Sequence, residues 1–229
     1  MIPIKDHNPS GIFPIVTYSL LALNILIFLS YSFDEIEAAN MFLQYALVPD
    51  EIMRGENYHT LISSMFLHGG FMHLAGNMAF LYIFGDNLEA KFGKLKFLGF
   101  YLASGIIASA VQIWSNPDSF IPNVGASGAI AGVMGGYLIL YPKAKVDILI
   151  LLGGFTRIST IPAFYMLGYW IALQVFMGIQ SFGAEGGGVA YWAHAGGFIA
   201  GVIITALFLP LKNIMKNFFH CKEKGSCIT

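Results

Sequence analysis

The chain has 229 residues, of which 56% are hydrophobic and 11% are charged, and its formal net charge is −1. Soluble domains carry about 25% charged residues, so this composition excludes an ordinary water-soluble protein and indicates an integral membrane protein. A near-neutral chain offers no basic surface for nucleic acid, and we expect no nucleic-acid partner. The length suits one domain, residues 1–229.

The first apolar run, residues 12–33, predicts a membrane-spanning helix. A span needs roughly 20 apolar residues, and this run is too long for the apolar centre of a signal peptide and lacks a small-residue cleavage site after it. Residues 34–58 then carry six acidic residues against a single basic one, Arg54, with apolar residues between them. We expect a sizeable, amphipathic, acidic loop after the first span.

The next three helices are expected at residues 71–89, 95–114 and 127–141, from apolar length and flanking helix breakers. The last of these is too short to cross a bilayer. A stretch with two prolines and two asparagines, residues 116–123, precedes it. Irregular backbone at membrane depth is tolerated only where it lines a protein-walled cavity, so this broken entry indicates a site.

The rest of the chain predicts two further spans. The apolar segment 148–152 is too short to cross, and we interpret it as an interfacial or re-entrant piece. A fifth span at 162–182, a glycine-rich turn at 183–188 and a sixth span at 190–209 follow, and residues 211–229 form a basic tail. The fold class predicted is an all-α integral membrane bundle of six transmembrane helices, with no soluble second domain.

The basic residues alternate between loops, and this asymmetry orients the spans. With a cytoplasmic N-terminus, 11 of the 12 basic residues fall on the inner face and only Arg54 falls outside. We therefore expect an even number of spans with both termini in the cytoplasm. The inner basic residues are Lys5, Lys91, Lys94, Lys96, Lys143, Lys145, Arg157, Lys212, Lys216, Lys222 and Lys224.

The cysteine and histidine residues do not form a pattern typical of a metal site. Cys221 and Cys227 lie in the basic tail, where a cytoplasmic position predicts reduced thiols, and they lack the four ligands of structural zinc. His68 and His73 have no carboxylate or cysteine to complete a first coordination shell, and no His-Glu-x-x-His occurs. We expect no metal site.

Ser127 lies in the sequence Gly125-Ala126-Ser127-Gly128, where the broken loop turns into the short helix. Small residues at this spacing commonly serve helix packing, which is one interpretation. The other is a nucleophile, because the hydroxyl would face the loop cavity. The unpaired amides and positive dipole of a helix N-terminus can also stabilise an oxyanion.

A serine nucleophile needs a general base at neutral pH, and His194 is the only histidine in the last four predicted spans. The alternative is a buried packing residue. Small residues recur every four positions on the fourth and sixth helices, so the two backbones can approach closely. That contact would bring Ser127 within hydrogen-bond distance of His194, about 2.6–3.2 Å. The small residues are Gly128, Gly132 and Gly136, and Ala193, Gly197 and Gly201.

His73 and Asn77 are four residues apart and therefore share one face of the second helix. Polar hydrogen bonding between helices is one interpretation. The functional interpretation is a pair of N–H donors that face the nucleophile, where negative charge would develop on a scissile carbonyl oxygen.

Four motifs follow one another along the chain: His68 to Asn77; Gly85, Glu89 and Gly93; Gly-Ala-Ser127-Gly; and Ala-His194-x-x-Gly. In this order and on these spans they resemble the rhomboid family of intramembrane serine proteases. The resemblance covers residues 12–210. It implies a Ser–His dyad without a third acidic member, in which Ser127 is the nucleophile and His194 the base.

The resemblance also implies the surroundings of the dyad. His73, Asn77 and the Ser127 amide would surround the oxyanion, and the substrates would be single transmembrane segments of other proteins, cut near their outer end. The acidic loop would lie at the membrane interface, and the helix from Pro162 would be a lateral gate. No metal or organic cofactor is implied, and the compact form resembles members from prokaryotic cell membranes.

Two positions depart from the family pattern. Tyr58-His59 replaces a Trp-Arg pair before the second helix, and Ala131 replaces an aromatic that often packs on the catalytic histidine. Two other functions remain open: a non-catalytic rhomboid-like protein that binds membrane helices, and a small transporter with a broken helix but no internal repeat. Glu89 is predicted far from Ser127, which favours a structural role that accepts hydrogen bonds from backbone or from a neighbouring helix end.

Overall fold

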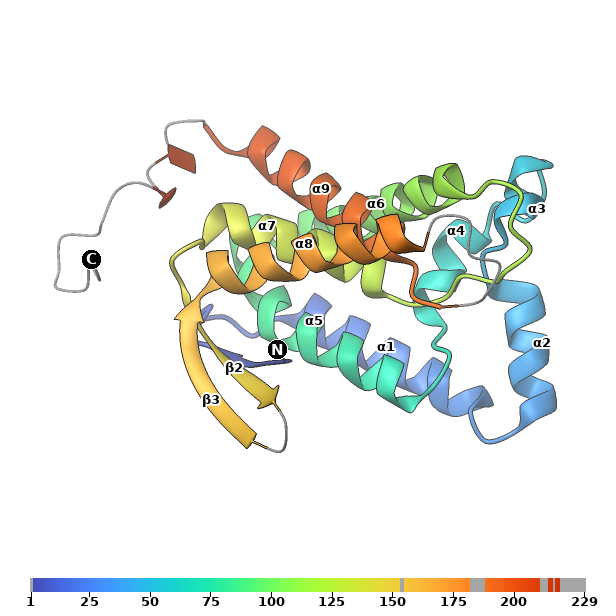
Figure 1. Cartoon of the computed structure of the whole chain (residues 1–229), viewed down its shortest axis with the longest axis horizontal. Coiled ribbons are helices and arrows are strands. Elements are labelled where there is room, and N and C mark those ends of the chain that lie inside the picture. Colours follow the sequence, from blue (N-terminus) through green and yellow to red (C-terminus); the bar gives the residue numbers. More distant parts are fainter. Residues whose placement is uncertain (1, 153–154, 182–187, 211–213, 216, 219–229) are drawn as a thin grey trace, which may run out of the picture.

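The computed structural model describes residues 2–152, 155–181, 188–210, 214–215 and 217–218. Within these ranges the chain is mostly helical (Figure 1). Most of the predicted glycine-rich turn lies outside them. So does nearly all of the basic tail, with Cys221, Cys227 and its four lysines.

Six helices occupy the positions of the six predicted spans. Among the described residues, α6, α8 and α9 are long and apolar enough to cross a membrane, while α1 and α7 are apolar but shorter. The count of six spans therefore stays a prediction. The six helices are α1 (Ile15–Tyr31), α5 (Phe71–Phe92), α6 (Lys94–Ser115), α7 (Ser127–Leu140), α8 (Ala163–Gln180) and α9 (Tyr191–Phe208).

The acidic loop between α1 and α5 folds into short helices at one end of the bundle (Figure 1). Asp34 begins the first of them, because its carboxylate accepts hydrogen bonds from the amides of Ile36 and Glu37. The loop elements are α2 (Glu35–Tyr45), α3 (Pro49–Met53), α4 (Thr60–Ser63) and the 3-10 helix η1 (Ser64–Phe66).

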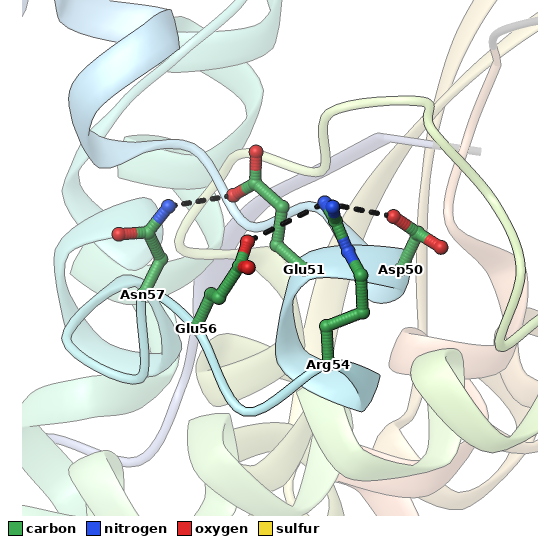
Figure 2. A network of polar contacts seen from close by, with 5 residues as sticks. All are labelled: Asp50, Glu51, Arg54, Glu56 and Asn57. Carbon is green, nitrogen blue, oxygen red and sulfur yellow. Dashed lines mark hydrogen bonds and ion pairs between the residues drawn. The ribbon is translucent and has the colours of Figure 1, made fainter.

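Polar contacts shape the tip of this loop, as Figure 2 shows. The Arg54 guanidinium lies 2.9 Å from the Asp50 carboxylate and 3.5 Å from that of Glu56. The Asn57 amide donates to Glu51 at 2.9 Å. Exposed ion pairs contribute less than about 1 kcal/mol each, so these contacts define the turn more than they stabilise the fold.

Two further hydrogen bonds hold the loop where the family's Trp-Arg pair is absent. Nε2 of His59 lies 2.9 Å from the carbonyl oxygen of Gln44, and the Ser63 hydroxyl donates to the carbonyl of Tyr45 at 2.9 Å. Both connect the α4 region back to the end of α2. The first loop is therefore braced by histidine and serine contacts to backbone.

The all-α prediction is wrong, because a three-stranded antiparallel sheet lies at the end of the bundle opposite α2 and α3 (Figure 1). Its strands are β1 (Ile2–Asp6), β2 (Lys145–Leu152) and β3 (Phe155–Pro162), in the order β1-β2-β3. The segment 148–152, interpreted as interfacial or re-entrant, belongs to β2. Pairing with β1 and β3 satisfies its backbone, which a short isolated segment in lipid could not do.

The sheet is anchored to the bundle on one face and through one carboxylate. Val146 and Ile148 are fully buried against the helices. Asp6 of β1 accepts hydrogen bonds from the Tyr137 hydroxyl at 2.8 Å and the Asn87 amide at 2.9 Å. Removal from water raises the pKa of Asp6 above its usual value, although these hydrogen bonds act in the opposite direction.

Strand β3 continues directly into α8. The amides of Ala163 and Phe164 donate to the carbonyls of Ala144 and Pro142 at 2.8 and 2.9 Å. These hydrogen bonds fasten the first turn of α8 to the segment that leaves α7. The base of α8 is therefore fixed by the sheet and by its hydrogen bonds to this segment.

Helix α7 is almost completely buried, and it contacts α6 through small side chains and α9 through backbone. A Cβ atom at Gly197 would overlap the carbonyl oxygen of Gly128, and one at Gly201 would overlap that of Gly132. The small-residue faces of the two helices are thus in direct contact. Gly135, outside the predicted row, meets the Phe198 carbonyl in the same way.

Glu89 lies at the far end of α5 from the acidic loop and is 1% exposed. Its carboxylate accepts hydrogen bonds from the amides of Val16 and Thr17 at 3.0 and 2.8 Å and from the Thr17 hydroxyl at 2.9 Å. These amides lie in the first turn of α1, where no intrahelical acceptor exists and the helix dipole favours negative charge.

Candidate active site

Ser127 is the first residue of α7, and His194 lies in the first turn of α9. Oγ of Ser127 lies 2.8 Å from Nε2 of His194, within hydrogen-bond distance. This distance falls in the range expected from the sequence, and the backbone contact between α7 and α9 accounts for it. A hydroxyl in this position can lose its proton to the imidazole as it attacks an electrophile.

Two residues of α8, which the sequence analysis did not find, hold the other side of the imidazole. Nδ1 of His194 lies 2.8 Å from Oε1 of Gln174, and the ring centroid of Trp170 lies 5.6 Å from that of His194. They contact the imidazole where the family often uses an aromatic residue at the position of Ala131. The available signal was a glutamine inside an apolar span, one turn after a tryptophan.

His73 and Asn77 converge on Gly125, two residues before Ser127. A Cβ atom at Gly125 would lie 2.7 Å from Nε2 of His73 and 3.6 Å from Nδ2 of Asn77. The Gly69 amide donates to Nδ1 of His73 at 3.4 Å, which leaves the proton of a neutral ring on Nε2. Nδ2 of Asn77 is buried and has no hydrogen-bond partner among the residues described.

Gly125 is required at this position for two reasons. Its φ of 126° lies in a region that favours glycine. A side chain there would also collide with the His73 ring. The glycine therefore lets two N–H donors approach the backbone that leads into Ser127.

His68 lies behind His73 and does not contact Ser127 or His194 through any hydrogen bond described. Its backbone is fixed by Tyr31, whose hydroxyl donates to the His68 carbonyl at 2.9 Å. Burial, together with the nearby His73, lowers the pKa of His68 to about 4, so the ring is neutral at pH 7. Within the described ranges, no three His, Cys, Asp or Glu side chains are placed to hold a metal ion.

These groups share one cavity of about 980 Å³. Ser127, His194, His73, Asn77 and Trp170 all line it. Its walls are α5, the loop that precedes α7, the first half of α7 and the segment that leads into α9, and Trp170 contributes from α8. Its size is at the upper end of small-molecule sites and accommodates several side chains of an extended peptide. The Ser127 hydroxyl, the His194 imidazole and the polar side chains of His73 and Asn77 thus line a common space.

A family model described as a rhomboid domain matches residues 55–211, more than half of the chain. The chain belongs to the rhomboid family. Rhomboids are multi-pass integral membrane proteins, in agreement with the three long apolar helices. Family membership also agrees with the motifs that surround Ser127 and His194.

Curated relatives of this rhomboid include named proteases. It is 29% identical over 198 residues to Rhomboid protein 1, mitochondrial, of Saccharomyces cerevisiae, covering 82% of this chain and 51% of the relative. It is 35% identical over 132 residues to Putative rhomboid protease YdcA of Bacillus subtilis, covering 56% of this chain and 63% of the relative. It is 30% identical over 167 residues to Rhomboid protease AarA of Providencia stuartii, covering 64% of this chain and 54% of the relative. The chain thus spans between half and two thirds of the length of these relatives.

Proposed function

We propose that this rhomboid is an intramembrane serine endopeptidase that cuts transmembrane segments of other membrane proteins. The observation that carries the proposal is the 2.8 Å hydrogen bond between Ser127 and His194 at a shared cavity. A rhomboid-like protein that only binds helices needs neither a base on its serine nor unpaired donors beside it. Relatives named as proteases support the same function.

The reaction follows from the positions of these groups. Oγ of Ser127 attacks the scissile carbonyl carbon while Nε2 of His194 accepts the hydroxyl proton. The N–H groups of His73, Asn77 and Ser127 donate to the oxyanion that forms. The imidazolium then protonates the leaving amine, and a water molecule activated by His194 hydrolyses the acyl-enzyme.

Substrate reaches the dyad from the lipid bilayer. We infer that α8 is the lateral gate, because Trp170 of α8 lines the cavity and because backbone hydrogen bonds to the segment after α7 fasten α8 at its first turn. A substrate helix has to unwind to present a carbonyl group, since its backbone is otherwise engaged in its own hydrogen bonds. The acidic loop would lie at the membrane interface above the site.

We further propose that both termini face the cytoplasm of a prokaryotic cell. Strands β1, β2 and β3 carry Lys5, Lys145 and Arg157 at one end of the bundle. The acidic helices α2 and α3 lie at the opposite end (Figure 1). Basic loops face the cytoplasm in membrane proteins, so the sheet would lie inside.

Reconstitution with a model substrate tests the function. The purified chain in liposomes is expected to cut a single-span protein within its membrane segment, and a fluorophosphonate probe is expected to modify Ser127, located by mass spectrometry. A folded protein that cuts no member of a panel of single-span substrates and leaves Ser127 unmodified would instead support helix binding, which crosslinking to the same panel measures.

Replacing Asn77 by alanine is expected to lower kcat/KM by about 10²- to 10³-fold, because one donor to the oxyanion is lost. The thermal unfolding temperature in detergent should stay near that of the wild type, since Nδ2 of Asn77 has no partner within the described structure. Asn40→Ala, at an exposed position of α2, is the matched control. Wild-type rates in Asn77→Ala would remove this residue from the oxyanion site.

Replacing Glu89 by glutamine is expected to affect stability more than catalysis. The variant loses a charge and one acceptor for the first turn of α1, which lowers the free energy of unfolding by about 1–3 kcal/mol. Thermal unfolding measures this loss, and Glu56→Gln, at an exposed carboxylate, should leave it unchanged. A fully folded Glu89→Gln variant that cuts no substrate would contradict a structural role.

A further inference from the structure

We propose that Gln174 is a positioning residue for the general base: its side-chain oxygen holds the His194 imidazole in the tautomer and orientation that face Ser127. The inference rests on the proposed function. It adds a third member to the dyad, and that member lies on the helix assigned as the gate.

Hydrogen bonds on both sides of the imidazole carry the inference. Oε1 of Gln174 lies 2.8 Å from Nδ1 of His194, and Oγ of Ser127 lies 2.8 Å from Nε2. An amide oxygen only accepts, so Nδ1 must carry the proton of the neutral ring. Nε2 is then the unprotonated nitrogen that can take the proton of Ser127.

Gln174 is placed for this role by burial. Its side chain is 8% exposed and lies on the inward face of α8. Nothing in a purely apolar helix contact requires a glutamine there, and polar side chains within membrane spans are commonly functional. The hydrogen bond to His194 gives its buried oxygen a partner.

Trp170 supports the same imidazole from one turn earlier on α8. Its ring is tilted 34° to that of His194, and it also contacts Phe198 at a centroid distance of 6.3 Å. The tryptophan thus lies against two residues one turn apart on α9. This tilted ring contact limits rotation of the imidazole, while Gln174 selects its tautomer.

A neutral amide differs from the carboxylate of a serine-protease triad. A carboxylate orients the histidine and also stabilises the imidazolium that forms, whereas an amide only orients it. A buried carboxylate inside a bilayer is also costly. The titratable group that acts on His194 from a neighbouring helix is His73 of α5, and among the described residues α7 and α8 place no charged side chain against it.

Because both contacts come from α8, the position of the gate controls the base. Ser127 and His194 are joined through the rigid backbone contact of α7 with α9. Gln174 and Trp170 would leave the imidazole when α8 moves outward to admit a substrate. The imidazole is therefore held by Gln174 and Trp170 only while α8 packs against α9.

Two substitutions at position 174 separate positioning from packing. Gln174→Leu keeps a similar volume but removes the acceptor, and it is expected to lower kcat by about 10- to 100-fold with little change in KM. Gln174→Glu keeps the acceptor and adds a charge. It is expected to retain activity and to move the acid limb of the kcat profile to higher pH, because a carboxylate stabilises the imidazolium.

A second glutamine on α8 provides the control. Gln180→Leu, exposed near the end of α8, should behave as the wild type. If Gln174 had only a structural role, kcat would fall in both variants in proportion to the fall in unfolding temperature. The pH profile of Gln174→Glu would then match that of the wild type, and that result would overturn the inference. If Gln174→Leu does not fold, the pH profile of Gln174→Glu decides.

Nitrogen-15 NMR of labelled histidines, with His194 assigned from a His194→Ala sample, gives a readout that needs no substrate. The wild type should show the Nδ1-protonated tautomer at His194, and Gln174→Leu a mixture. Loss of this tautomer in Gln174→Leu supports the inference even if no substrate is cut. A cleaving wild type whose Gln174→Leu variant keeps both tautomer and kcat rejects positioning and leaves the proposed function intact.

Discussion

Replacing Ser127 by alanine is expected to lower kcat/KM for a transmembrane substrate by on the order of 10⁴-fold or more, because no other group can form the acyl-enzyme. His194→Ala should cost a similar factor. The double variant should be no worse than either single one, since the two residues act as a unit. Initial rates on a liposome-embedded substrate measure all three.

Unfolding temperatures separate chemical loss from misfolding in this series. The Ser127 hydroxyl makes one hydrogen bond at a partly exposed position, so the alanine variant should unfold near the wild-type temperature. Ser30→Ala applies the same change at an exposed position of α1. If Ser127→Ala cuts as well as the wild type, the dyad mechanism is wrong.

Replacing Gly201 by alanine is expected to lower the free energy of unfolding by about 3 kcal/mol or more. The added Cβ would overlap the carbonyl oxygen, the carbonyl carbon and the Cα of Gly132. These are backbone atoms of a buried helix and cannot rotate aside as a side chain does. The helices must separate, which also lengthens the distance between Ser127 and His194 and lowers activity.

A second glycine-to-alanine variant shows whether the loss of stability comes from the contact between Gly201 and Gly132. A Cβ at Gly99 of α6 meets nothing within 4 Å. Gly99→Ala should therefore be neutral or stabilising, since alanine favours a helix over glycine by about 1 kcal/mol. Equal stability of the Gly201→Ala and wild-type proteins would refute the close approach of α7 and α9.

The positions of the helices could be predicted from the sequence because each apolar run is bounded by breakers or charges. The sheet could not, since the residues of β1 pair with residues of β2 at least 140 positions away and non-local pairing leaves no local pattern. Part of the signal was present. Gly153-Gly154 between two runs rich in β-branched residues is typical of a hairpin, yet the apolar segment 148–152 was interpreted as an interfacial or re-entrant piece.

The candidate site was predictable where chemistry restricts the choice. A serine nucleophile needs a base, and His194 is the only histidine in the last four predicted spans, while the small-residue rows supplied the contact. Gln174 and Trp170 were missed because the partner of a base can be any acceptor or ring on a neighbouring helix. A glutamine one turn after a tryptophan in an apolar span was a sign of them, but the packing of α8 against α9 is what places both on His194.

The shortness of α7 sets the depth of the chemistry. A helix of 14 residues rises about 21 Å, whereas the hydrocarbon layer is about 30 Å thick. With its inner end at the inner boundary of that layer, α7 leaves Ser127 about 9 Å below the outer one. In the proposed orientation, hydrolytic water would have to cross this depth to reach Ser127, and longer acyl chains in the lipid would lengthen the distance.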